Sequence, residues 1–177
     1  QMLDSIVEAT RDSNKIIIFS EFIETTKIIA SYLEKKLGSN EVAVFSRALS
    51  EGEMQVSANK FQNDDDCRIL ICDKSGGEGR NFQFADRIIH YNIPWSPDEL
   101  EQRIGRLDRV GRDISKDVIS DVIYCKETTE EDVFKLFNKC LNIFGEYLSG
   151  IENAVLEFEN TCRVRPSLDK LKEVINS

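Results

Sequence analysis

The stretch KIIIFS, residues Lys15–Ser20, is a short run of apolar side chains with a polar residue at each end. Such a run is typical of a parallel strand covered on both faces, because neither face then needs polar side chains. Similar short runs follow at Val42–Phe45, Arg68–Cys72, Arg87–Ile93 and Val118–Tyr124. The sequence therefore predicts a sheet of short, buried strands.

Helical segments separate the predicted strands. Apolar residues recur every three to four positions in the first of them, which we expect to end at Gly38. Ser50 and Glu53 have the spacing of a capping box at the start of the next helix. A further helix is expected to begin at Asp98 and to reach at least Leu107. Strands alternating with helices predict an α/β fold with a mainly parallel sheet.

Residues 126–177 differ from the preceding part because their pattern is helical only. We therefore predict a sheet domain over residues 1–125 and a helical extension over residues 126–177, packed on that domain or on a partner. The chain begins with Gln1 and not with methionine, so we expect it to be part of a longer polypeptide.

The composition favours a folded domain without a metal site or a membrane span. Apolar residues make up 41% of the 177, and no apolar run approaches the ~20 residues of a membrane helix. No secretory leader opens the sequence, so we expect a protein of the cytoplasm, or of the nucleus in a eukaryote. The cysteines are scattered and expected to be reduced, and His90 is expected to be packed rather than catalytic.

The net charge of −9 argues against a protein that binds nucleic acid through a broad basic face. Screening limits the reach of a charge to about 10 Å at 0.1 M salt, so a local basic site is compatible with this total. Any contact with phosphate is therefore expected to come from a few placed side chains.

The segment EQRIGRLDRVGR, residues Glu101–Arg112, is the most informative one for chemistry. Placed on a helix, it puts Gln102, Arg106 and Arg109 on one face, opposite an apolar stripe that includes Leu107. A guanidinium donates two parallel hydrogen bonds to phosphate and stays charged at every pH. The polar stripe is suited to clamp a transferring γ-phosphate; the alternative is a solvated face whose arginines pair with neighbouring carboxylates.

A glycine-rich loop, Ser75–Gly79, follows the third predicted strand at its carboxyl end, where ligands bind in open α/β sheets. Glycines let a backbone approach phosphate or sugar closely, although a generic tight turn has the same composition. The loop lacks the G-x-x-x-x-G-K-[ST] pattern that cradles nucleotide phosphates, and no acidic pair suited to magnesium follows a strand. We therefore do not expect this chain to hydrolyse ATP by itself.

In order and spacing these segments resemble the second motor domain of helicase superfamily two, in its Swi/Snf-related branch. Within that branch they look most like the bacterial RapA-type RNA-polymerase-associated ATPases. KIIIFSEF at Lys15–Phe22 resembles the family's fourth motif, SGGEGRNFQFA at Ser75–Ala85 the fifth, and QRIGRLDRVGR at Gln102–Arg112 the sixth. Tyr91–Pro97, between the last two, matches the family's spacing.

The resemblance implies a RecA-like three-layer domain with a C-terminal helical extension. It implies that Arg106 and Arg109 are arginine fingers, with Gln102 helping to position them. They would reach ATP that is bound, with Mg²⁺, mainly by a first RecA-like domain absent from this sequence. A nucleotide cleft is implied at three successive residues of the glycine loop: Gly77, Glu78 and Gly79.

The resemblance also implies duplex DNA as a partner, through contacts to backbone phosphates that position without reading sequence. RNA polymerase or another protein complex is a further implied partner. The candidate phosphate-contacting residues are Ser20, Ser46, Arg47, Lys74 and Arg80.

Three residues depart from the family's pattern. Met54 stands where relatives usually have an arginine, and Arg112 replaces a usual glutamine. Asp73 stands where Swi/Snf members often have a threonine that faces the nucleic acid, so we expect an anion there to repel phosphate.

Three other interpretations remain open on the sequence. One is a RecA-like scaffold without catalysis, whose acidic helical tail docks a protein such as RNA polymerase. Another is the equivalent domain of an RNA helicase, and the third is an unrelated nucleotide-binding α/β domain. The upstream sequence would separate the first from a motor, because a scaffold need not keep the nucleotide loop.

Overall fold

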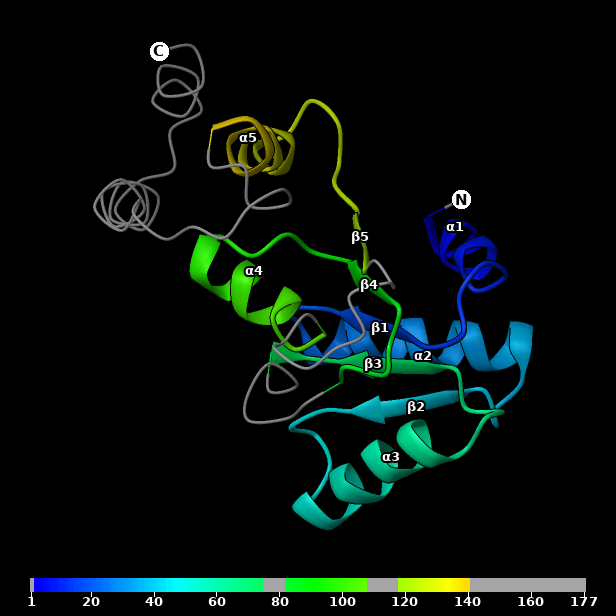
Figure 1. The fold of residues 1–177 in the computed structure, drawn as a ribbon. Helices are drawn as coiled ribbons and strands as arrows, with labels where there is room; N and C mark the ends of the chain where they lie inside the picture. Colours follow the sequence, from blue (N-terminus) through cyan, green and yellow to red (C-terminus); the bar gives the residue numbers. More distant parts are fainter. Residues whose placement is uncertain (1, 75–81, 108–117, 141–177) are drawn as a thin grey trace. The chain divides into compact units, whose positions relative to one another are not determined.

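The computed structural model describes residues 2–74, 82–107 and 118–140, and its centre is a parallel sheet (Figure 1). The sheet has five strands in the order β2-β3-β1-β4-β5, and every neighbouring pair is parallel. The strands are β1 Ile16–Phe19, β2 Val42–Phe45, β3 Ile69–Cys72, β4 Arg87–His90 and β5 Ile119–Val122. The predicted parallel α/β sheet is confirmed.

The described helices lie before, between and after these strands. They are α1 Met2–Ala9, α2 Ile23–Leu37, α3 Glu51–Asn63, α4 Pro97–Ile104 and α5 Thr129–Lys135, followed by the π-helical turn η2 Leu136–Cys140. No helix within the described ranges is long and apolar enough to cross a membrane.

The chain forms two compact units. The first comprises Gln1–Asn92 and Arg103–Ile123 and contains the whole sheet, whereas the second comprises Ile93–Gln102 and Tyr124–Ser177. Our division into residues 1–125 and 126–177 stays a prediction, since residues 141–177 lie outside the described ranges.

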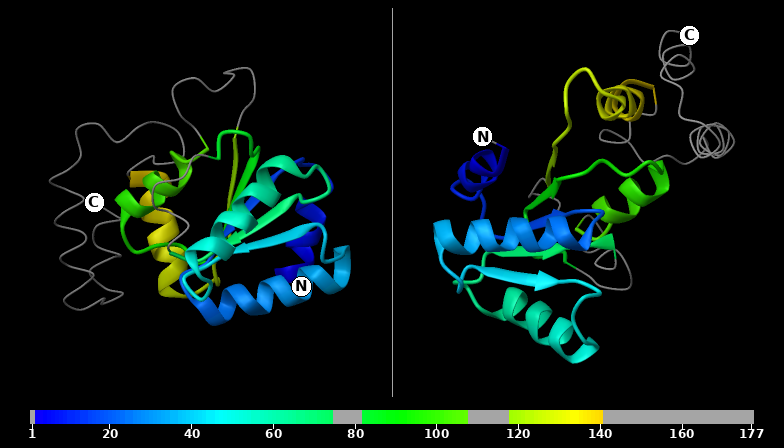
Figure 2. Two further views of the ribbon diagram at one scale, coloured as in Figure 1. Left: turned by 90° about the horizontal axis from the view of Figure 1, so that it is seen from below. Right: turned by 180° about the vertical axis from the view of Figure 1, so that it is seen from behind.

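Side chains alternate between the two faces of the sheet, and helices cover both faces. Ile16 and Ile18 of β1 join the core beneath α1 and α2, while Ile17 and Phe19 join the core beneath α3. Figure 2 shows α2 and α3 on opposite faces. The chain passes from β1 through α2 to the edge strand β2 and returns through α3 to β3, so the two connections run in opposite directions across the sheet. Crossovers of the same hand then require α2 and α3 to lie on opposite faces. The sheet unit is therefore a three-layer domain.

The two predicted helix caps are present. Gly38 ends α2 with φ +120°, a conformation that favours glycine, and its N–H donates to Glu34 O at 3.0 Å. At the start of α3 the Ser50 hydroxyl accepts from the N–H of Glu53 at 3.3 Å, and the Glu53 carboxylate accepts from the N–H of Ser50 at 2.8 Å. Both caps involve neighbours in sequence, which is why the sequence could predict them.

Two strands end earlier than predicted. β4 ends at His90 and not at Ile93, because the carbonyl and the side chain of Asn92 bond outside the sheet ladder. β5 covers Ile119–Val122 and not residues 118–124, because it lies at the edge of the sheet and pairs with β4 alone.

Candidate functional site

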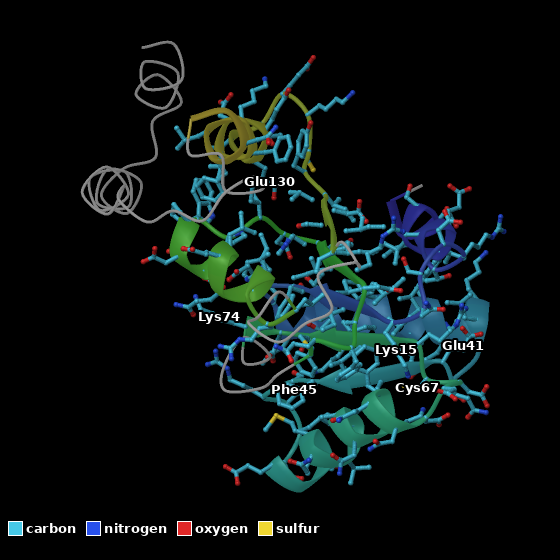
Figure 3. The ribbon with its side chains drawn as sticks, viewed as in Figure 1. Lys15, Glu41, Phe45, Cys67, Lys74 and Glu130 are labelled. Atoms are coloured by element: carbon cyan, nitrogen blue, oxygen red, sulfur yellow. The ribbon has the colours of Figure 1, made fainter. Side chains whose placement is uncertain are left out.

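The carboxyl ends of the parallel strands lie along one edge of the sheet, the edge where open α/β sheets bind ligands. We name it the carboxyl edge: the residues that follow β1, β2, β3 and β4, namely 20–22, 46–49, 73–74 and 91–92. The amino edge comprises the residues around the strand starts, namely 14–15, 41, 67–68 and 86–87. Figure 3 shows Phe45 and Lys74 at the carboxyl end and Lys15, Glu41 and Cys67 at the opposite end.

Asp73 fixes the turn that follows β2. It is 2% exposed, and its Oδ2 accepts hydrogen bonds from the Ser46 hydroxyl at 2.6 Å and from the N–H of Arg47 at 2.9 Å. The Ser46 hydroxyl accepts in turn from the N–H of Ala48 at 3.2 Å. The Ser46 hydroxyl and the N–H of Arg47 bond the same buried carboxylate and so limit the positions that the turn can take. The adjacent ends of β2 and β3 are therefore joined into one rigid corner.

This corner corrects our expectation for Asp73, which was that its charge faces a nucleic acid. The side chain is buried and directed at the β2–α3 turn. Ser46 is buried as well, and its hydroxyl donates its proton to Asp73. Arg47 and Lys74 are exposed charged residues of the corner. At the ends of β2 and β3, these two residues are therefore the ones that we still predict to contact phosphate directly.

Ser20 and Asn92 join the ends of the two central strands. The Ser20 hydroxyl is buried and donates to Asn92 Oδ1 at 3.1 Å, and the N–H of Glu21 donates to the same oxygen at 3.4 Å. The Ser20 proton is thus donated within the protein in this structure, and its contact with phosphate stays a prediction.

Arg103 is a buried arginine that our sequence reasoning did not single out. Its side chain is 2% exposed, and Nη2 lies 2.5 Å from Oε1 of Glu21. Nη1 donates to the carbonyl of Asn92 at 3.4 Å, and the guanidinium lies over the ring of Phe19, 5.3 Å from the ring centroid. An available signal was its spacing, because Arg103 follows the apolar Leu100 by three positions and so shares its helical face.

His90 is packed at the end of β4, as predicted. It is fully buried and stacks on Phe19 with ring centroids 6.4 Å apart and planes at 16°. Both ring nitrogens lack a hydrogen-bond partner within the described ranges. Burial, with a smaller contribution from the charge of Arg103, lowers the pKa of His90 from 6.5 to about 3. His90 is therefore neutral at physiological pH.

Arg106 lies on a turn and not on the helix that we predicted. α4 ends at Ile104, and the next bonds are the tighter pairs Arg106 N–H to Arg103 O at 3.3 Å and Leu107 N–H to Ile104 O at 3.0 Å. Gly105 favours this ending, since glycine is the second-poorest helix former. The predicted helix to Leu107 is therefore wrong, and Gln102 and Arg106 do not share one helical stripe, while Arg109 lies outside the described residues. The predicted burial of Leu107 is confirmed.

The turn at residues 105–107 contacts the segment that follows the glycine loop. The N–H of Phe82 donates to the carbonyl of Arg106 at 3.0 Å, and Phe82 and Leu107 belong to the same buried core. Arg106 itself is half-buried. Two of the three motif segments, which are far apart in sequence, are thus side by side in the sheet unit.

Several predicted site residues lie outside the described ranges. They are Gly77, Glu78 and Gly79 of the glycine loop, Arg80 next to it, and Arg109 after the turn. Arg112, which departs from the family pattern, lies outside the described ranges as well. Gln102 is described, and it is exposed on α4.

No group of three metal-ligating side chains gathers among the residues that the structure describes. Cys67 and Cys72 are buried free thiols, and Cys125 is an exposed one. Burial, and next the charge of Asp73, raises the pKa of the Cys72 thiol. Cys72 is therefore a packed, protonated side chain and not a nucleophile.

A parallel sheet covered by helices on both faces is a three-layer α/β domain, and its similarity to solved Swi2/Snf2 ATPase cores identifies it as RecA-like. The model of the helicase conserved C-terminal domain matches residues 1–111. The chain belongs to this family.

Its relatives narrow the family further. RNA polymerase-associated protein RapA of Vibrio campbellii is 34% identical over 146 residues, which are 82% of this chain and 15% of that protein. RapA of Vibrio cholerae serotype O1, strain M66-2, is 37% identical over 141 residues, covering 79% of this chain and 14% of that protein. The chain thus spans about 15% of the length of the curated relatives it matches.

Solved structures agree with this assignment. The Sulfolobus solfataricus SWI2/SNF2 ATPase core in complex with dsDNA has a TM-score of 0.68 at 27% identity, covering 97% of this chain and 34% of that chain. The C-terminal part of the Fun30 ATPase domain has a TM-score of 0.67 at 21% identity, covering 89% of this chain and 51% of that chain, and supports the fold alone. The chain is a C-terminal motor domain of superfamily two, Swi/Snf-related and resembling RapA.

Proposed function

We propose that this chain is the second motor domain of an ATP-dependent translocase on duplex DNA. In this proposal Arg106 and Arg109 reach ATP held mainly by the first motor domain of the same protein, and Gln102 helps to position them. The observation that carries it is the bond between Arg106 and Phe82, which joins two family motif segments in one unit of a matched helicase domain.

The residues of the chain fit one part of an ATP site. A guanidinium stabilises the charge that develops on the transferring γ-phosphate, and arginine fingers contribute about 10³–10⁵ in rate in nucleotidases. No group of three metal-ligating side chains lies among the described residues, and we propose that the first domain holds the Mg²⁺ ion. ATP supplies the phosphoryl group, whereas this chain supplies positive charge and position.

Exposed cations at the carboxyl edge support a contact with the DNA backbone. Arg47 and Lys74 follow neighbouring strands, and the Ser46–Asp73 corner fixes the turn between them. We propose that Arg47, Lys74 and Arg80 contact phosphates, with Ser20 and Ser46 as supporting positions. Gly77, Glu78 and Gly79 would couple this track to the nucleotide.

The mechanism that we propose is closure of this domain onto the first one. Closure completes the ATP site with the arginines, and hydrolysis reopens it, so that the protein moves along the DNA backbone. The name of the RapA relatives includes association with RNA polymerase, and one structural neighbour is in complex with dsDNA. We propose both as partners of the full-length protein that contains this chain.

The test is ATP hydrolysis by the full-length protein with duplex DNA, with duplex RNA and with neither. Arg106→Ala is expected to lower DNA-stimulated turnover by about 10³-fold or more while ATP still binds. Arg11→Ala is the matched control, since Arg11 is exposed and belongs to the segment before β1. Near-normal turnover in Arg106→Ala would remove the finger assignment.

Stimulation by RNA and not by DNA would instead favour an RNA helicase. A folded full-length protein without turnover under any of these conditions would favour the scaffold interpretation.

A further inference from the structure

We propose that Glu21 and Arg103 form a positioning pair, which holds the turn bearing Arg106 at the carboxyl edge. The inference rests on the proposed function, because it concerns how Arg106 is placed. Neither residue is a catalytic residue in this proposal, since the contacts described for them are within the protein. Their role is to determine where the Arg106 guanidinium can reach.

The pair is part of a closed ring of contacts. Arg103 Nη2 contacts Oε1 of Glu21 at 2.5 Å, and Nη1 donates to the carbonyl of Asn92 at 3.4 Å. The side-chain oxygen of Asn92 accepts from the N–H of Glu21 at 3.4 Å, which completes the ring. Glu21 follows β1 and Asn92 follows β4, so Arg103 is bonded to the ends of these two neighbouring strands. Because the guanidinium is planar and bonds two different groups, both its position and its orientation are fixed.

The ring is linked directly to Arg106. The N–H of Arg106 donates to the carbonyl of Arg103 at 3.3 Å, and the carbonyl of Arg106 accepts from Phe82 at 3.0 Å. Gly105, whose backbone is not restricted by a side chain, lies between the two arginines. Both backbone groups of Arg106 are therefore hydrogen-bonded, and the bond made by its N–H depends on the position of Arg103.

The attraction between the two charges, and not only packing, keeps Arg103 in place. The Arg103 side chain is 2% exposed and that of Glu21 is 22% exposed. A buried guanidinium that loses its carboxylate is strongly destabilised where it lies. With the pair broken, we expect Arg103 to move toward water and to carry the Arg106 turn with it. A displacement of about 1 Å at a catalytic group can lower a rate by about 10²-fold.

The chain contains a matched control pair at the amino edge. Arg68 Nη2 contacts Oε2 of Glu41 at 2.8 Å, and its Nη1 donates to the carbonyl of Thr10 at 3.2 Å. This pair also joins an arginine to one glutamate and one backbone carbonyl. It lies at the opposite end of the strands from the Glu21–Arg103 pair, so its loss is expected to affect stability alone.

The experiment compares Glu21→Gln with Glu41→Gln in the full-length protein with duplex DNA. Glu21→Gln is expected to lower kcat by about 10- to 100-fold, with KM for ATP changed by less than about 3-fold, as for a displaced finger. Glu21→Asp, which keeps the charge, is expected to restore part of the loss. Glu41→Gln is expected to keep the kcat of the unmodified protein. Thermal unfolding verifies that each variant is folded at the assay temperature, and Arg103→Lys replaces any Glu21→Gln protein that is not.

Equal kcat values for Glu21→Gln and Glu41→Gln would overturn the positioning pair, as would a loss in Glu21→Gln that appears in KM alone. Arg106→Ala is measured beside them to separate two failures. If Arg106→Ala loses turnover but Glu21→Gln does not, the pair is wrong and the proposed function stands. If Arg106→Ala keeps turnover, the proposed function itself fails.

Discussion

The amino and carboxyl edges of the sheet both carry charged side chains, but they use them differently. At the amino edge Lys15 Nζ donates to the carbonyls of Phe61, Asp64 and Cys67 at 2.8, 2.7 and 2.8 Å. Asp86 at the same edge accepts from the N–H groups of residues 14 and 15 at 2.8 and 3.2 Å. These charges therefore satisfy backbone groups at the starts of strands and at the end of α3.

At the carboxyl edge the buried charges hold one exposed turn and one partly exposed carboxylate. Asp73 holds the turn after β2, and Arg103 pairs with Glu21. Arg47 and Lys74 are exposed there. The comparison teaches that the amino edge is built for stability, whereas the carboxyl edge combines a fixed polar layer with outward cations. We expect changes at the carboxyl edge to alter both activity and stability, and changes at the amino edge to alter stability alone.

The largest effect of a substitution on stability is expected when the arginine of each ion pair is replaced. Arg103→Met leaves Glu21 without its buried partner and is expected to cost about 3 kcal/mol of unfolding free energy. Arg68→Met breaks a more exposed pair and is expected to cost about 1 kcal/mol. Urea unfolding of the two variants measures the difference, and equal losses would remove the distinction between the edges.

Lys15→Met tests whether the amino edge serves stability alone. The variant leaves three carbonyl oxygens without their charged donor, so we expect a loss of about 2 kcal/mol in unfolding free energy. DNA-stimulated turnover of the full-length protein should be unchanged at a temperature where the variant is folded. A fall in kcat without unfolding would contradict the assignment of this edge.

Acid is expected to weaken the carboxyl edge through His90. Its pKa is about 3 when folded against an ordinary 6.5, so the unfolded chain takes up a proton first as the pH falls. The stabilisation is complete above pH 6.5 and is lost toward pH 3, by about 1.4 kcal/mol per pH unit in between. His90→Phe should have a smaller slope of unfolding free energy between pH 6 and 4. Equal slopes in urea titrations would show that His90 does not govern this loss.

The smallest effect is expected at the start of α3. Ser50→Ala removes the hydroxyl that accepts from the N–H of Glu53 and should cost about 1 kcal/mol. The hydrogen bonds of Ser50 lower the pKa of the Glu53 carboxyl, so this pKa should rise in the variant. Urea unfolding and an NMR titration of Glu53 measure the two effects. An unchanged pKa would mean that the capping box does not form in solution.

Local features of the fold could be predicted because they depend on neighbours in sequence. The runs around Ile16–Phe19 and Ile69–Cys72 form buried strands, and the caps at Gly38 and Ser50 form as expected. The end of α4 was predicted three residues too late, since apolar spacing continues to Leu107 although the helix does not. After Ile104 the chain forms a tighter turn, in which the carbonyl of Arg106 accepts a hydrogen bond from Phe82, a residue distant in sequence.

The candidate site could be predicted in outline and not in its contacts. Motif order placed the chemistry in the segments around Ser20, Lys74 and Arg106, and these follow or flank the carboxyl edge. It could not show that Asp73 is buried or that Arg103 pairs with Glu21, which is 82 positions away. The partners of a buried charge are determined by which strands are neighbours, and strand order is a tertiary property.

The sequence by itself determined the strands, the helix caps and the order of motifs, because each depends on residues close together along the chain. The tertiary structure alone decided which polar groups face each other at the carboxyl edge. With the strand order β2-β3-β1-β4-β5, the end of β1 lies beside the end of β4, and so Glu21, Asn92 and Arg103 come together. Burying a charge is favourable only where its partners are in place, and the fold provides them.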